Sequence, residues 1–336
     1  MNITEFAKLA NVSKSAVSRY FNGGYLAEDK KAQIAAAVQQ TGYRPSATAQ
    51  TLRTRQTRQI GVVMPKLSSE SCARMVEGIS SVLSEHGYQL LLVNTANDPA
   101  REVEALDMFR HNRVDGVIFI ATIFTQAHRS VLQRMHMPVV IMGQKYDGFN
   151  CVFHDDEGAA RELTRLMLAK GRRCPWYLGV TLEDRAAGFW RRSGFINALK
   201  EYDLPPRPER MCLAEFNAES GFEQAATLLG RAPEIDCLFC ATDNIALGAM
   251  HYCRTRNIRV PEDLMLAGIG DNRAGRRAAV PLTSAHFHYR TSGQDAAGML
   301  LDMLGGEKIG VRALELGYEI MERASTGAPE TEHLFW

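Results

Sequence analysis

Hydrophobic residues follow two different spacings along the chain, and the change falls close to residue 59. Before it, apolar positions recur every three or four residues, as on one face of a helix. After it, short apolar runs alternate with longer amphipathic stretches. The first spacing predicts a small all-helical domain. The second predicts an α/β fold in which parallel sheets are flanked by helices.

Three helices are expected before residue 45. Phe6, Ala7, Leu9 and Ala10 give the first helix an apolar face. Asn11 then tolerates the left-handed backbone that a tight turn between helices requires.

The second and third helices are bounded by local signals. Ser13 is a good N-cap for a helix over 14–22, which buries Val17 and Phe21. A third helix is expected over about 28–41. Together the three helices have the spacing of a helix-turn-helix domain.

Charge separates this segment from the rest of the chain. Residues 1–60 carry nine basic and three acidic side chains, a net charge of +6, whereas the whole chain has a net charge of +1. A compact basic segment favours an anionic partner, and nucleic acid is the first candidate. The alternative is a solvated charged surface.

Short polar and basic side chains lie on the outer side of the second helix. Arginine pairs with guanine edges and asparagine with adenine, while hydroxyls bind phosphates or bases. We therefore expect this helix to read the major groove of double-stranded DNA, the alternative being a plain three-helix domain with a polar surface. The expected contacts are Ser13, Lys14, Ser15, Ser18, Arg19 and Asn22.

The segment ITEFAKLANVSKSAVSRYFN resembles the N-terminal signature of the lactose/galactose repressor family of bacterial transcription regulators, and GYRPSATAQTLRT resembles the hinge of that family. The resemblance continues through CVFHDDEGAA, GFWRRSGFINAL, ATDNIALGAM and PLTSAHFHYRTSGQDAA, so it covers nearly the whole chain. GIGDN, LTSAHFHY and YLGVTLEDRAAG resemble the sucrose- and trehalose-responsive branch. The departures from residues common in the family are Asn11, Ala16, Ala27, Ser46 and Gln50.

The hinge is too short to hold a helix alone in water. The resemblance implies that it folds on operator DNA, paired with the hinge of a second subunit. Leu52 would then wedge into the minor groove, and Arg53 would meet phosphates. The alternative is an ordinary flexible linker.

The chain after residue 59 predicts two similar series of strands and helices. The expected strands are Ile60–Met64, Leu90–Val93, Val117–Ile120, Val139–Met142, Trp176–Gly179, Met211–Leu213, Cys237–Cys240 and Met265–Ile269. The expected helices are Ala73–His86, Glu102–His111, Val131–Met135, Gly158–Lys170, Gly188–Glu201, Ser220–Leu229 and Asn244–Asn257.

The resemblance gives these elements a domain organisation. It implies a three-helix helix-turn-helix domain over 1–45, a hinge helix over 46–58, and an effector-binding and dimerisation domain over 59–336. The last would consist of two Rossmann-like, parallel-sheet subdomains of the periplasmic-binding-protein type, linked by three crossings. Their approximate extents are 59–157 plus 288–310, and 158–287 plus 311–336.

A small-molecule effector is expected between the two lobes, at the carboxyl ends of the strands. Carboxylate, amide and guanidinium groups suit sugar hydroxyls because each can bind two neighbouring oxygens. The candidate residues are Lys66, Ser69, Ser71, Asp155, Arg185, Arg191, Asp243, Asn244, Asp271 and Asn272.

Several alternatives remain open at this site. Lys66, Arg185 and Arg191 could neutralise a phosphate, so a sugar phosphate competes with a free sugar or polyol. Trp190 or Phe287 could stack on a sugar face. For any one candidate residue the alternative is a surface loop or a helix cap, and Asp243 in particular lies where a helix starts.

Other chemistry has little support. Gly268-Ile269-Gly270 lacks the third glycine of a dinucleotide-binding turn, and Cys237 with Cys240 lacks a second ligand pair at zinc spacing. We therefore expect that the protein binds no cofactor and no metal and that it is not an enzyme. No apolar run approaches membrane-spanning length, no secretory signal opens the chain, and the odd number of cysteines, seven, favours reduced thiols in the cytoplasm.

We interpret the chain as a transcriptional repressor of a carbohydrate-utilisation operon. A homodimer would read a pseudopalindromic operator and be released by its effector. A tetramer is the alternative assembly, and the absence of an extended heptad pattern in 326–336 favours the dimer. The rival functions are a repressor that uses a co-repressor, a solute-binding sugar receptor for a transporter, and a cytosolic sugar-processing enzyme.

Overall fold

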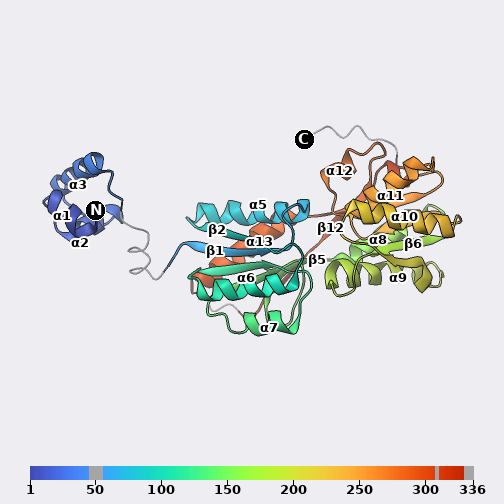
Figure 1. Ribbon diagram of the computed structural model, residues 1–336, viewed down its shortest axis with the longest axis horizontal. Coiled ribbons are helices and arrows are strands. Elements are labelled where there is room, and N and C mark those ends of the chain that lie inside the picture. Colours follow the sequence, from blue (N-terminus) through green and yellow to red (C-terminus); the bar gives the residue numbers. More distant parts are fainter. Residues whose placement is uncertain (45–55, 307–309, 329–336) are drawn as a thin grey trace. The chain divides into compact units, whose positions relative to one another are not determined.

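The computed structural model describes residues 1–44, 56–306 and 310–328 (Figure 1). The chain divides into two compact units, Met1–Arg58 and Gln59–Trp336. The hinge residues Leu52 and Arg53 lie outside the described residues, as does most of the C-terminal tail. Within the described ranges, no helix is long and apolar enough to cross a membrane.

The first unit is a three-helix domain around one apolar core. Its helices are α1 (Ile3–Leu9), α2 (Lys14–Phe21) and α3 (Glu28–Thr41). Ser13 caps α2 through its hydroxyl, which accepts from the backbone N–H of Ala16 at 3.2 Å. Asn11 has the expected left-handed backbone, with φ 51°. Phe6 and Val17 are fully buried, so the sequence-based helix-turn-helix is confirmed.

The prediction that Leu9 belongs to the buried apolar face of α1 is wrong. Leu9 is 54% exposed, whereas Phe6 and Ala10 are buried. The residues that face the core recur four apart along one side of the helix, and Leu9 lies off that line.

The second unit contains two six-stranded sheets that share one strand order. In order across the first sheet, the strands are β11 (Ala313–Leu316), β5 (Asn150–His154), β4 (Val139–Met142), β3 (Gly116–Ile120), β1 (Gln59–Met64) and β2 (Gln89–Asn94). In order across the second, they are β12 (Tyr318–Met321), β10 (Thr283–Phe287), β9 (Met265–Ile269), β8 (Cys237–Cys240), β6 (Pro175–Gly179) and β7 (Met211–Leu213). The strand pairings are parallel except β10 with β12.

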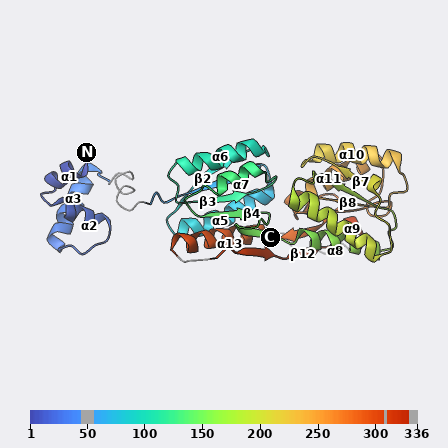
Figure 2. The ribbon, with the colours of Figure 1, turned by 90° about the horizontal axis from the view of Figure 1, so that it is seen from below.

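Helices cover both faces of each sheet, which is why the central strands are apolar throughout (Figure 2). The first sheet is covered by α5 (Glu70–Glu85) with α13 (Tyr289–Leu304), and by α6 (Pro99–His111) with α7 (Gln126–Leu132). The second is covered by α8 (Asp156–Ala169) with α9 (Arg191–Glu201), and by α10 (Ala218–Arg231) with α11 (Asp243–Thr255). The shorter helices are η1 (Arg185–Trp190), η2 (Pro208–Arg210), α12 (Arg273–Arg276) and η3 (Ala324–Thr326).

The chain passes between the lobes three times. The passages follow β5, follow β10, and separate β11 from β12 at Gly317. One core cluster includes residues under α5 and α13 of the first lobe and under α8 and α9 of the second.

The structure differs from the sequence-based elements in several places, and the strands β10, β11 and β12 are not among the expected ones. β5 is an additional strand that the apolar runs do not predict, although its residues are largely buried beside β4. The helix expected over 131–135 is α7, which begins at Gln126 because Thr125 and His128 form a capping box there. Ala313–Leu316 pairs with β5 in the first sheet, so the last crossing falls after residue 316 rather than near 311.

Candidate functional site

A cavity of about 540 Å³ lies between the lobes, at the carboxyl ends of strands from both sheets. Its first-lobe walls are the loops that follow β1, β3 and β4, and its second-lobe walls include the starts of α10 and α11. Ligands of open α/β sheets bind at this edge because the side chains of several loops converge there. The cavity falls within the ~300–1,000 Å³ range of small-molecule sites.

The structure brings most of the expected effector residues to this cavity. Those that line it are Lys66, Ser69, Ser71, Arg191, Asp243, Asn244 and Asn272. Asp155 and Arg185 instead line a neighbouring cavity of about 430 Å³, and Asp271 lines neither of the two. Of the two aromatic candidates, Phe287 lines the first cavity and Trp190 the second.

The first-lobe wall is built around the start of α5. The hydroxyl of Ser69 caps the helix by accepting from the N–H of Cys72 at 3.4 Å, and it lies 2.8 Å from the hydroxyl of Ser71. Lys66 lies in the loop just before. Hydroxyls, an ammonium group and a helix N-terminus make this wall rich in hydrogen-bond donors.

Arg191 forms the floor of the cavity with Asp156. Its Nε donates to Asp156 Oδ1 at 2.7 Å, and its Nη1 donates to the carbonyl of Ala241. Burial disfavours the guanidinium charge, but the charge of Asp156 outweighs it and raises the pKa of Arg191. The guanidinium also lies 5.6 Å from the ring centre of Phe287. Arg191 therefore has a fixed orientation and a neutralised charge.

A second buried carboxylate joins the lobes. Asp184 accepts from the side-chain amide of Gln144, a first-lobe residue, at 3.1 Å and from the N–H of Ala187 at 2.9 Å. Gln144 in turn accepts from the hydroxyl of Tyr146. Burial raises the pKa of Asp184 to about 7, so its protonation changes close to neutral pH.

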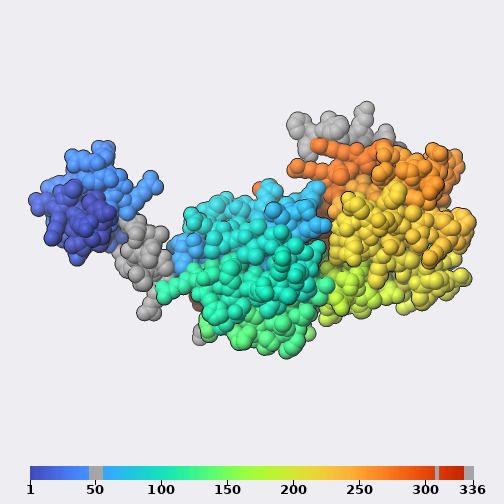
Figure 3. All heavy atoms as spheres, in the orientation of Figure 1, coloured from blue at the N-terminus to red at the C-terminus, as the bar shows by residue number. Residues whose placement is uncertain are grey.

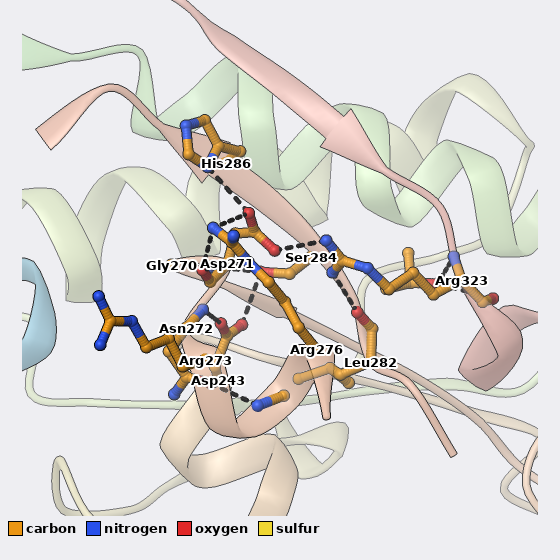
Figure 4. Close-up of polar contacts among 12 residues, drawn as sticks. Asp243, Gly270, Asp271, Asn272, Arg273, Arg276, Leu282, Ser284, His286 and Arg323 are labelled. Carbon is orange, nitrogen blue, oxygen red and sulfur yellow. Dashed lines mark hydrogen bonds and ion pairs between the residues drawn. The ribbon is translucent and has the colours of Figure 1, made fainter. Parts of the chain in front are cut away.

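Asp243 is held by a network on the second lobe (Figure 4). Its carboxylate accepts from the N–H of Asn272 at 2.7 Å and from the hydroxyl of Ser284 at 2.6 Å. Burial raises its pKa to about 6. The alternative that Asp243 caps α11 is wrong, because Thr242 is the N-cap and accepts from the N–H of Ile245.

Asp271 lines neither cavity, and its carboxylate contacts three cationic or protonatable side chains (Figure 4). Its carboxylate lies 2.6 Å from both Arg276 and Arg323 and 2.9 Å from His286. Burial alone would raise its pKa, but the hydrogen bond with His286 and the two arginine charges lower it to about 2. We assign Asp271 a structural role, connecting the loop after β9 to the segment after β12.

The two lobes touch along the seam between them in the space-filling view (Figure 3). The carboxylate of Glu70 accepts from the N–H of Arg273 at 3.0 Å, and Arg74 donates to the carbonyl of Gly270 at 3.4 Å. These bonds run from α5 to the loop after β9, so the rim of the cavity contains polar contacts between the lobes.

Sequence reasoning missed Asp156, Asp184 and Gln144. The two aspartates immediately precede or begin helices, where a carboxylate is ordinarily interpreted as a cap. Gln144 lies in a loop without a recognisable motif. Only their burial between the lobes distinguishes them from surface residues.

On the first unit, the expected DNA-contact residues lie on or beside α2. Lys14, Ser15, Arg19 and Asn22 are exposed, and Ser18 is half-buried. The side-chain amide of Asn22 donates to the carbonyl of Ser18, which orients it along the helix. Ser13 is engaged in capping, so it has a structural role besides any contact with DNA.

Two family models match the chain. The model described as bacterial regulatory proteins, lacI family, matches residues 2–46, and the model for a periplasmic binding protein-like domain matches residues 164–326. These matches fall on the three-helix unit and, for the most part, on the second lobe.

Individual proteins match along nearly the full length. The sucrose operon repressor of Staphylococcus xylosus is 29% identical over 313 residues, covering 93% of this chain and 97% of that protein. The HTH-type transcriptional repressor PurR of Actinobacillus pleuropneumoniae is 30% identical over 313 residues, covering 91% and 92%. A solved structure of the transcriptional regulator CelR with cellobiose has a TM-score of 0.75 and 25% identity, covering 97% and 99%. The fold, the helix-turn-helix and these full-length matches agree: the chain belongs to the lacI family of bacterial regulatory proteins, a family of DNA-binding transcription regulators that respond to small-molecule effectors.

Proposed function

We propose that the protein represses a carbohydrate-utilisation operon and is released from its operator by a neutral sugar or polyol bound between the lobes. The observation that carries this proposal is the central cavity. Carboxylate, guanidinium, amide and hydroxyl groups from both lobes line it, and these groups bind adjacent sugar hydroxyls in pairs. The similarity to a sucrose operon repressor and to a cellobiose-bound regulator supports the same ligand class.

The charge of the cavity favours a neutral sugar over a sugar phosphate. Carboxylates outnumber cations along its walls: the acidic residues are Glu70, Asp156, Asp184, Glu219 and Asp243, and the basic ones are Lys66 and Arg191. The positive charge of Arg191 is already balanced by Asp156. A phosphate would therefore meet more carboxylates than cations, and its support among the described lining residues would be Lys66 and the starts of α5, α10 and α11.

On the DNA side, we propose that a homodimer places two α2 helices in successive major grooves of a pseudopalindromic operator. Arg19 and Asn22 would contact base edges, while Leu52 and Arg53 of the hinge would enter the minor groove and bind phosphates. The effector would change the relative position of the lobes and thereby the spacing of the two hinges. Because a regulator of this family acts on bacterial DNA, we propose that the protein acts in the cytoplasm.

The test is operator binding by the full chain with and without sugars. Fluorescence anisotropy would be measured on promoter fragments and on random DNA, alone and with sucrose, cellobiose, a polyol and the corresponding sugar phosphates. Specific binding that weakens with a neutral sugar supports the proposal. Tighter binding with sugar would identify a co-repressor, and release only by a phosphorylated sugar would reinstate the phosphate interpretation. Equal affinity for operator and random DNA would count against a repressor.

A further inference from the structure

The cavity beside the central one has a composition of its own. Its volume is about 430 Å³, and it lies at the carboxyl ends of β4, β5 and β11, next to η1. The residues that line both cavities are Gly143, Gln144, His154, Asp156 and Ala186. The two cavities therefore meet at one shared wall, made by these five residues.

One polar side chain of this shared wall has an atom without a partner. Gln144 is bonded to Asp184 and Tyr146, and Asp156 is paired with Arg191. His154 is 5% exposed, and among the buried side chains that the structure describes its Nε2 is one of few atoms without a hydrogen bond. Leaving a buried polar atom unpaired is unfavourable, so Nε2 is suited to a ligand hydroxyl that replaces water.

The ring of His154 is fixed and neutral. It stacks on Phe287 with 4.7 Å between ring centres and lies edge-on to Tyr289 at 5.2 Å. Burial, reinforced by the charge of Arg191, lowers its pKa to about 3. A neutral imidazole nitrogen in a fixed position can exchange one hydrogen bond with a sugar hydroxyl without a charge to compensate.

The second cavity also carries an exposed aromatic face. Trp190 is 39% exposed, and the guanidinium of Arg185 lies 6.0 Å from its ring. An indole face packs against the apolar face of a sugar ring, while a neighbouring guanidinium donates to the ring hydroxyls. The other charged residues of the cavity are of both signs: Arg129, Lys145, Asp147, Asp155, Asp156, Glu157 and Glu315. This mixture suits a neutral polyhydroxyl ligand rather than an ion.

We infer that this cavity is a second saccharide subsite, in which Trp190 and Arg185 hold a sugar ring and His154 contacts it from the wall shared with the central cavity. The inference rests on the proposed function and extends it, because it assigns Arg185, an expected effector residue of the neighbouring cavity, to ligand binding, whereas the carboxylate of Asp155 caps α8 by accepting from the N–H of Gly158 at 2.7 Å. The sugar ring in this cavity has one of two origins. It is the second unit of a disaccharide that reaches from the central cavity, or it belongs to a separate molecule.

The experiment compares sugar binding by the full-length protein and its variants, using isothermal titration calorimetry with sucrose, cellobiose, glucose and fructose. Trp190→Ala removes the aromatic face, and Trp190→Phe restores much of it. His154→Phe keeps a ring but removes the nitrogen, and His154→Gln keeps a polar group. Leu182→Ala is the matched control, because Leu182 is a 40% exposed apolar residue near η1 that lines neither cavity.

We expect Trp190→Ala and His154→Phe each to weaken binding of a disaccharide by about tenfold or to remove a second binding event, and a tenfold loss corresponds to about 1.4 kcal/mol. Trp190→Phe and His154→Gln should recover most of the affinity. One disaccharide per chain identifies a spanning ligand, and two sugars per chain identify separate molecules. The melting temperature of His154→Phe without sugar should not fall, since the variant removes an unpaired buried atom.

Other results overturn the inference and remain distinguishable from failure of the proposed function. If sugars bind and release the operator but Trp190→Ala and His154→Phe bind them as the unsubstituted protein does, the second subsite is wrong and the repressor stands. If none of the four sugars binds, the subsite is wrong as well. Operator binding, measured separately without sugar, then decides whether the protein is a repressor with another effector.

Discussion

Two aspartates illustrate how the same side chain serves different purposes at different places in the second lobe. Asp184 is buried with neutral hydrogen-bond donors, whereas Asp271 is buried against Arg276 and Arg323. Burial raises the pKa of Asp184 to about 7, and the paired charges lower that of Asp271 to about 2. These opposite shifts give opposite dependences of stability on pH.

Asp271→Asn should destabilise the second unit. The folded-state pKa is below the ordinary value, so the stabilisation is fully present above pH about 4 and is lost as pH falls towards 2. At pH 7 the free energy of unfolding should drop by about 2–3 kcal/mol, and the difference should narrow below pH 4 and close near pH 2. Urea unfolding across this range measures it. Asp263→Asn is the control, because the pKa of Asp263 is also lowered to about 2 but its pair with Arg259 lies at the surface, where solvent screens the attraction. A loss comparable to that of Asp271→Asn would contradict the burial argument.

Asp184→Asn should change the free energy of unfolding with the opposite dependence on pH. Asp184 is protonated in both states below pH about 4 and ionised in both above 7, where the folded state carries the cost of a buried charge. Wild-type stability from this group therefore falls as pH rises from about 4 to 7. The variant should match the wild type near pH 4 and exceed it by up to about 4 kcal/mol above pH 7. Urea unfolding at a series of pH values measures the difference, and a difference that is constant across pH would rule out this titration.

Substitution of Arg19 tests the expected DNA contacts most directly, because Arg19 is exposed in the last turn of α2. If Arg19 reads a base edge, Arg19→Ala should weaken operator binding by ~1–3 kcal/mol and leave random-DNA binding nearly unchanged. Equal losses on both DNAs would assign it to phosphate. Lys31→Ala removes the same charge from α3 and should not alter the ratio of specific to non-specific affinity.

At the scale of elements, glycines set the distance between packed helices. A Cβ on Gly293 of α13 would lie 2.1 Å from the carbonyl oxygen of Met75 in α5, and one on Gly78 of α5 would lie 2.0 Å from that of Arg290. The helix backbones therefore approach at a distance that only glycine permits.

Gly293→Ala should destabilise the second unit by about 1–3 kcal/mol, because the backbone of α5 cannot yield as a flexible side chain would. Gly298 lies in the same helix, and a Cβ added there would meet no neighbouring atom of the described chain within 4 Å. Gly298→Ala should stabilise by ~0.5–1 kcal/mol through helix propensity. Thermal unfolding of the two variants compares them directly, and a stabilising Gly293→Ala would refute the close approach.

At the scale of the whole molecule, each unit has a core of its own. The first is built around Phe6, Val17 and Ile34, and these residues belong to no cluster of the second unit. Separate cores favour separate unfolding transitions.

Scanning calorimetry should accordingly resolve two transitions. A bound sugar should raise the transition of the second unit, by about 2.7 kcal/mol of stability at a hundred times its dissociation constant, and leave the first in place. Operator DNA should raise the first. A single transition shifted by either ligand would show that the units unfold cooperatively.

Features that depend on residues close together in the chain could be predicted from the amino-acid pattern alone. Ser13 and Asn11 define the start of α2 and the turn before it, and the apolar runs identify most strands, because caps, turns and periodicity act over a few residues. The family resemblance supplied the order of domains. The additional strand β5 could not be predicted in this way, because its pairing with β4 and β11 is a non-local contact.

Which polar residues face the cavity depends instead on how distant parts of the chain pack together. Asp243 and Asp271 both follow strands and look alike in sequence, yet Asp271 is drawn away by Arg323, a residue from near the end of the chain. Asp184 and His154 acquire their properties from burial between lobes, and Trp190 belongs to a cavity beside the central one. Such placements depend on contacts between segments far apart in the chain and on the burial of individual atoms, neither of which a local pattern contains.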